Sequence, residues 1–298
     1  LVDCIDSNFV SSVGAKVTEF EEKVAEFIGC KHAIATVNGT AALHVAIELA
    51  GVKPGDEVIS QALTFIATCN AITYTGAKPL FIDVDIDTMG LSPAALKNFL
   101  ENNAEKRVGG TFNKLSGKRI SACVPMHTFG FPCRIVEIAV ICADWDIALI
   151  EDAAESLGSY VGNRHTGTFA SMATLSFNGN KVITTGGGGM IITDDSDLAK
   201  RAKHVTTTAK VPHPYEFVHD EVGYNYRMPN LNAALGCAQM ERLDEFLTVK
   251  AQLADQWDTL FEKIGGDFVK AIDGYKANHW LNAIILDSRE DRDEFLKM

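Results

Sequence analysis

SFNGNKVITTGGGGMIIT, residues 176–193, places a single lysine, Lys181, five residues before a run of four glycines. Such a lysine could bind phosphate with a glycine-rich loop, bond covalently to a cofactor while the glycines leave room, or lie on the surface before a flexible turn. A phosphate-binding P-loop has its glycines before the lysine, whereas here they follow it, so the first interpretation fails. A lysine held at a strand end, with small residues close behind it, remains suited to a Schiff base.

Short β-branched apolar runs alternate with helical periodicity on both sides of this segment. Strands buried on both faces read as continuous apolar runs, so the alternation predicts a largely parallel sheet with helices on both faces. The expected strands are 33–37, 56–60, 79–84, 120–126, 148–152, 173–177 and 189–193.

Beyond about residue 230, a long helical pattern carries the chain out of this sheet. We therefore expect a large domain over residues 1–235 and the start of a smaller C-terminal α/β domain over 236–298. The aromatic residues from 257 onward are expected to be core. Because the chain begins without methionine and stops directly after a helical segment, we also expect material to be missing at both ends.

The charge balance excludes some function classes. With 27 Lys and Arg against 39 Asp and Glu, the formal charge is −12, and no basic block stands out. This argues against a nucleic-acid or anionic-membrane role. The seven scattered cysteines form no CxxC pair, which indicates reduced, buried thiols in a cytoplasmic protein and neither a disulfide framework nor a metal site. No apolar run reaches the ~20 residues that span a bilayer.

Polar side chains follow several expected strands, where open α/β sheets bind their ligands. NGTAAL (38–43) opens a helix after a strand, so its backbone N–H groups suit a phosphate, although a capped helix after a tight turn is the simpler interpretation. Asp152 and Glu155 follow the strand that ends in ALIED, and either meet a cationic ligand atom or cap the next segment. Ser176 lies at a further strand end.

Taken together, these segments resemble the pyridoxal-phosphate (PLP) sugar aminotransferases of the DegT/DnrJ type, from about residue 8 to the end. The motifs occur in the family's order, and they are NGTAAL, TFIAT, EDAAES, SFNGNK, TTGGGG and GYNYRMPNLNAALG. The resemblance implies the aspartate-aminotransferase-like fold (PLP fold type I), with a mainly parallel sheet in the large domain and a smaller C-terminal α/β domain.

The resemblance also assigns roles at the ring of the cofactor. Lys181 matches the lysine that carries PLP as a Schiff base and then moves protons as a base. Asp152 matches the carboxylate that keeps the pyridine nitrogen protonated, so that the ring accepts electrons. Phe65, in TFIAT, matches the aromatic residue stacked on the ring. Glu155 stands near the 3-hydroxyl, where many relatives have glutamine.

The phosphate end is assigned in the same way. Thr40 and Ala41 match its backbone cradle, and Ser176 supplies a hydroxyl. Asn225, in GYNYRM, matches a phosphate ligand that reaches in from the neighbouring subunit, which implies a homodimer with shared active sites. Arg227 is a weaker candidate for the substrate.

His127 and His165 are two further weak substrate candidates. Both lie near loops of the expected site, in PMHTFG and NRHTG. A structural role in these loops is the alternative for both.

By this resemblance, the reaction transfers an amino group from L-glutamate, released as 2-oxoglutarate, to the keto carbon of a 4-keto-6-deoxy sugar nucleotide. GGTFNKLSGK (109–118) is similar to the branch that acts on a UDP-linked N-acetylated hexose, for amino-sugar or nonulosonic acid and polysaccharide biosynthesis. A dehydratase branch has histidine in place of Lys181. A PLP-dependent sugar dehydratase and a non-catalytic PLP-binding regulatory module remain the alternatives.

Overall fold

The computed structural model describes residues 1–11 and 14–297. Its centre is a mixed sheet in the order β1-β11-β10-β7-β6-β2-β3, and a hairpin of β4 and β5 joins β6. The strands are β1 (His32–Thr36), β2 (Glu57–Gln61), β3 (Lys78–Ile82), β4 (Ala104–Arg107), β5 (Gly110–Asn113), β6 (Arg119–Cys123), β7 (Ala148–Asp152), β10 (Met172–Ser176) and β11 (Gly189–Thr193).

Along this order of seven strands, four of the six neighbouring pairs run parallel, and β11 is the exception. The pairs β3–β2, β2–β6, β6–β7 and β7–β10 are parallel, whereas β11 is antiparallel to both β10 and β1. The mainly parallel α/β sheet predicted from the sequence is therefore confirmed. Part of the 109–118 segment forms β5, which pairs with β4 and β6.

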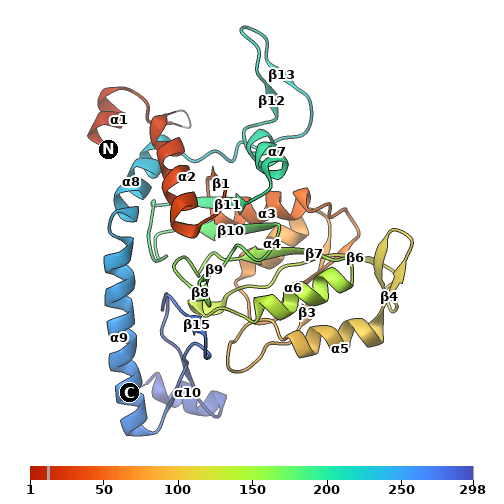
Figure 1. Ribbon diagram of the computed structural model, residues 1–298, viewed down its shortest axis with the longest axis vertical. Helices are drawn as coiled ribbons and strands as arrows, with labels where there is room; N and C mark the ends of the chain where they lie inside the picture. The colour runs from red at the N-terminus through yellow and green to blue at the C-terminus, as the bar shows by residue number, and fades with distance from the viewer. Residues whose placement is uncertain (12–13, 298) are drawn as a thin grey trace.

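Helices cover both faces of the sheet, as Figure 1 shows. One face packs against α3, α4 and α7, and the other against α2 and α8 near β1 and against α5 and α6 near β6. These helices are α2 (Ala15–Ile28), α3 (Gly39–Leu49), α4 (Ile66–Tyr74), α5 (Pro93–Asn103), α6 (Ile135–Asp144), α7 (Ser196–Thr206) and α8 (Asn230–Met240); α1 (Val2–Asp6) and the short 3-10 turn η1 (Thr128–Gly130) complete this part.

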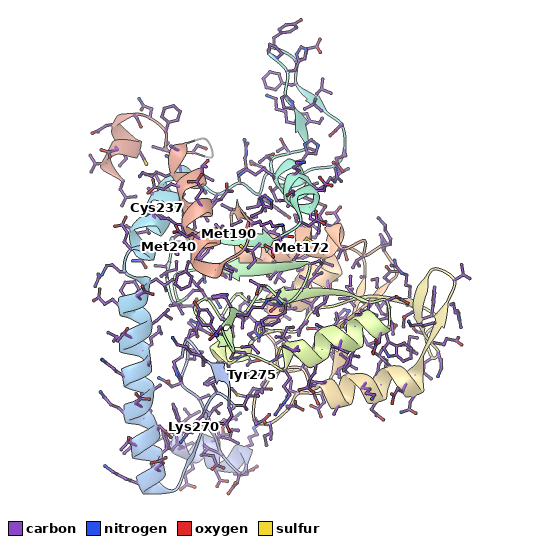
Figure 2. All side chains as sticks on the ribbon, in the orientation of Figure 1. Met172, Met190, Cys237, Met240, Lys270 and Tyr275 are labelled. Carbon is purple, nitrogen blue, oxygen red and sulfur yellow. The ribbon has the colours of Figure 1, made fainter. Side chains whose placement is uncertain are left out.

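The two-residue period of the strands divides the core between the two faces. On β1, Ile34 contacts the α3 side, whereas Ala33 and Ala35 contact the α2 side. Met172 and Met190 belong to opposite sides in the same way, and Figure 2 shows both at the level of the sheet. Burial on both faces explains why these strands are apolar throughout.

The C-terminal part leaves the sheet along α9 (Leu243–Ile264), which runs down one side of the molecule in Figure 1. The remaining elements are β8 (Tyr160–Val161), β9 (Arg164–His165), β12 (Lys210–Val211), β13 (Val218–His219), β14 (Asp267–Phe268), β15 (Tyr275–Lys276), β16 (Ile284–Ile285) and α10 (Arg289–Phe295). The expected domain division at residue 235 falls inside α8, which packs on α2, and β15 pairs with β8. That division stays a prediction.

Candidate active site

A cavity of about 280 Å³ lies beyond the carboxyl ends of β7 and β10, where the sheet meets the start of α3. Parallel strands place their last residues at one edge, which is the usual ligand position in such sheets. The cavity brings together six residues named from the sequence: Thr40, Phe65, Asp152, Glu155, Ser176 and Lys181.

The start of α3 forms one end of this cavity. Asn38 caps the helix, because its Oδ1 accepts the N–H of Ala41 at 2.8 Å. Ala41 is therefore already bonded and buried, and it is not among the described residues that line the cavity. The N–H groups of Gly39 and Thr40, the first two of the helix, have no acceptor within it and are available to an anion. The backbone donors are thus shifted by one residue from the expected pair.

Close backbone approach explains two of the glycines around this end. A Cβ on Gly39 would lie 2.9 Å from the Cβ of Ser176. A Cβ on Gly189, in β11, would lie only 2.3 Å from the carbonyl carbon of Asn38. Both contacts are shorter than real Cβ atoms show, so the turn before α3 and the strand β11 need glycine to pack together.

Asp152 also lines the cavity. Its side chain is 2% exposed; Oδ2 accepts the hydroxyl of Thr68 at 2.7 Å and Oδ1 accepts the N–H of Ala154 at 3.2 Å. Burial raises the pKa of Asp152, while the Thr68 hydrogen bond opposes that rise. Phe65 lines the cavity with a ring that is 60% exposed.

Lys181 reaches the cavity from the loop after β10. Its Nζ lies 3.4 Å from Oε1 of Glu155 and 3.8 Å from the centre of the Trp280 ring. The other oxygen of Glu155 accepts the N–H of Phe129 at 2.8 Å, and burial raises the pKa of Glu155.

Trp280 was expected to be core, and it is buried there, but its ring also forms a wall of the cavity. No motif in the sequence connects Trp280 to Lys181. The same expectation of a core position is wrong for Trp257 and Phe295, which are 40% and 46% exposed.

Asn225 and Arg227 lie outside the lining that the described residues give this cavity. Asn225 is exposed, and its Oδ1 accepts Nε and Nη2 of Arg227, both at 3.4 Å. Arg227 lines a separate hollow together with Lys210 and His213. Within one chain, neither side chain belongs to the Lys181 site.

The two histidines proposed as weak substrate contacts are also outside the cavity, and both are buried. His127 Nε2–H donates to Glu151 at 3.0 Å, and Nδ1 accepts the N–H of Cys133 at 3.2 Å. His165 Nε2 accepts the N–H of Gly158 at 2.7 Å, and burial lowers the pKa of His165 to about 4. Their ring nitrogens are occupied by the scaffold, so we correct both to structural residues.

Comparisons with known proteins point to one family. The model of the DegT/DnrJ/EryC1/StrS aminotransferase family matches residues 1–298. The chain is 36% identical to the GDP-perosamine synthase of Escherichia coli O157:H7, over 98% of this chain and 75% of that protein.

Two solved structures are similar over 99% of this chain, each with 28% sequence identity. The crystal structure of 3-amino-5-hydroxybenzoic acid synthase has a TM-score of 0.87 and is covered over 74% of its length. The structure of DesI in the presence of its TDP-sugar product has a TM-score of 0.84 and is covered over 72%. Within residues 1–11 and 14–297, no helix is both long enough and apolar enough to cross a membrane.

Proposed function

The chain belongs to the DegT/DnrJ/EryC1/StrS aminotransferase family, and from that premise we propose that the Lys181 cavity transfers an amino group from L-glutamate to a 4-keto-6-deoxy sugar nucleotide. Membership of the family establishes the general activity: the protein is a PLP-dependent aminotransferase that acts on nucleotide sugars. The names of the similar proteins above refer to GDP-linked and TDP-linked sugars. The UDP-linked N-acetylated hexose therefore stays a proposal for the substrate of this chain.

One observation carries the proposal: a single cavity holds an amine, a buried carboxylate and the open start of a helix. This donor set fits PLP. Free N–H groups of Gly39 and Thr40, with the hydroxyl of Ser176, suit a phosphate. The carboxylate of Asp152 suits a ring nitrogen that must keep its proton, and the amine of Lys181 suits an aldehyde.

Bound PLP supplies an aldehyde that takes up amines and a ring that accepts electrons. The protein's residues do the remaining work. Lys181 would hold the cofactor through its amine and, when free, would serve as the base that moves a proton. Asp152 would keep the pyridine nitrogen protonated, and Phe65 would cover the ring. Glu155 lies beside Lys181 and would exclude bulk water from its amine.

The proposal also includes a second copy of the chain. Asn225 is exposed and lies just after the hairpin of β12 and β13, which extends away from the body in Figure 1. Tyr215 and Phe217 in this hairpin are about four-fifths exposed, at 79% and 80%. We propose that this segment brings Asn225 to the phosphate-binding part of a partner's cavity. Such an arrangement is what the homodimer with shared active sites, implied by the family resemblance, requires.

Mixed dimers test the shared site. Lys181→Ala and Asn225→Ala are each expected to be inactive, because each removes a group from every site. If Asn225 acts across the dimer, a mixed dimer of the two variants has one intact site and regains activity. Mixed dimers without activity would show that Asn225 acts within its own chain, and an Asn225→Ala homodimer that is itself active would show that Asn225 does not act at all.

The cofactor and donor are tested by visible absorption of the purified protein with added PLP, before and after L-glutamate, beside Lys181→Ala. We expect an absorption band of the bound cofactor that glutamate removes and that the variant lacks. No band in intact wild-type protein would refute the proposal. A band that glutamate leaves unchanged would favour another donor or the non-catalytic module.

The substrate is tested by incubating the protein with 4-keto-6-deoxy sugars linked to UDP, GDP or TDP in the presence of glutamate. Mass spectrometry then detects the aminated product. A product that has lost water and gained no nitrogen would favour the dehydratase alternative. We also propose a cytoplasmic location, for which the support is that all seven cysteines are free thiols.

A further inference from the structure

Trp280 is fixed in the wall of the cavity by a short segment far along the chain. Asn278 holds this segment in place, because its Nδ2 donates to the carbonyl oxygens of Glu155 and Leu157 at 2.8 and 2.9 Å, and its Oδ1 accepts the N–H of Trp280 at 2.8 Å. The indole Nε1–H donates to the carbonyl oxygen of Asn180 at 2.7 Å. The backbone of Trp280 is therefore anchored to the loop of Glu155, and the nitrogen edge of its ring is anchored to the residue before Lys181.

The anchored ring faces the amine of Lys181. Nζ lies 3.8 Å from the centre of the ring and 3.4 Å from Glu155 Oε1, whereas the ring of Phe65 is 6.0 Å away. The side chains of Lys181 and Glu155 are only 12% and 4% exposed, so water screens these contacts weakly. The face of an indole and a carboxylate both stabilise a charged ammonium, and more strongly out of water.

We propose that Trp280 is a positioning residue, whose ring and the carboxylate of Glu155 together form a resting site for the Lys181 ammonium whenever this lysine is not bonded to the cofactor. The inference rests on the proposed function of Lys181 and adds the residue that keeps its amine at the cavity. Without the ring, the freed amine has one partner instead of two, and a long lysine side chain has several other rotamers to occupy.

The test uses PLP-free protein and cyanate, which carbamylates only uncharged amines. Peptide mass spectrometry gives the rate at Lys181 at a fixed, mildly alkaline pH, with exposed Lys97 on α5 as the internal reference. Trp280→Phe and Trp280→Leu both shrink the side chain and both lose the bond to Asn180. Only phenylalanine keeps an aromatic face, so the difference between the two variants isolates the ring.

We expect the rate at Lys181 to stay close to wild type in Trp280→Phe and to rise roughly five- to thirtyfold in Trp280→Leu, the range that the loss of a cation–π contact covers from exposed to desolvated sites. Equal rates in the two variants would overturn the inference. Circular dichroism first establishes that each variant is folded, and Trp280→Met replaces the leucine variant if that one is not.

This outcome is separable from that of the proposed function. If wild-type protein shows the glutamate-sensitive PLP band but the phenylalanine and leucine variants react equally with cyanate, the resting site is refuted and the aminotransferase site stands. If the wild-type protein shows no band, the proposed function fails whatever the cyanate rates are.

Discussion

Thr68→Val removes one hydrogen bond from the carboxylate of Asp152 and keeps nearly the same side-chain shape. The Thr68 hydroxyl donates to Asp152 Oδ2 at 2.7 Å, and both residues are buried, at 0% and 2% exposure. The remaining protein hydrogen bond to this carboxylate is longer, 3.2 Å from the N–H of Ala154. The hydroxyl therefore supplies the better of the two contacts to the charged form.

The expected effect is a shift of the acid limb of the pH profile. Burial already raises the pKa of Asp152, and the Thr68 hydrogen bond lowers it. In our proposal the carboxylate must be charged, so activity is present above its pKa and is lost as the pH falls through it. A hydrogen bond to a charged group contributes about 1.5–3 kcal/mol, which is roughly one to two pH units. Without the Thr68 hydroxyl, the loss of activity therefore begins roughly one to two pH units higher.

The assay is the glutamate half-reaction, followed as the change in cofactor absorbance in single-turnover experiments between about pH 5 and 9. Thr73→Val is the matched control, because Thr73 lies on the same helix and its hydroxyl donates to the carbonyl oxygen of Cys69, in an exposed position. An acid limb of Thr68→Val that coincides with that of the control and the wild type would refute the assigned role of Asp152.

Two further substitutions test the packing around the site. Gly189→Ala is expected to weaken PLP binding by roughly 1–3 kcal/mol, because its Cβ would meet the Asn38 backbone at 2.3 Å. Gly187→Ala is the control and should bind PLP as wild type does, because its Cβ meets no described atom within 4 Å. Equal Kd values of the two variants in a PLP titration would contradict the close packing at Gly189. Glu151→Gln is expected to destabilise the fold by about 2–4 kcal/mol, because the buried carboxylate accepts four hydrogen bonds, from His127 and from the N–H groups of Gly167, Phe169 and Ala170. Chemical denaturation measures this loss of stability, with Glu105→Gln as the exposed control. Equal midpoints for the two variants would show that the hydrogen bonds of Glu151 do not stabilise the fold.

Much of the fold was readable from the sequence because it depends on local patterns. Strands buried on both faces are continuously apolar, and polar residues directly after them must gather at one edge of a parallel sheet. Asp152, Ser176 and Lys181 were named on this basis and do line one cavity. The capping rule could also have shown that Asn38 would occupy the N–H of Ala41, since an N-cap side chain accepts from the second or third helical residue.

The remaining differences come from tertiary contacts that no local pattern encodes. Trp280 meets Lys181 because Asn278 ties its segment to the loop of Glu155 and its indole N–H donates to Asn180. His127 and His165 were placed near the site by sequence distance, but their side chains point into the scaffold and bond to Glu151 and Gly158. Whether a histidine is buried depends on the segments that pack over it, and its neighbours in the sequence do not reveal these segments.

The cavity is assembled from distant parts of the chain: its walls include Asn38 near the N-terminal end and Trp280 near the other. A cofactor bound in this cavity therefore contacts segments that come together only in the folded chain. Its binding free energy consequently stabilises the folded state and not the unfolded one. At a free PLP concentration one hundred times Kd, this linkage amounts to about 2.7 kcal/mol. The amount of this enzyme that survives in a cell should accordingly follow the supply of vitamin B6, with cofactor-starved chains the first to be degraded.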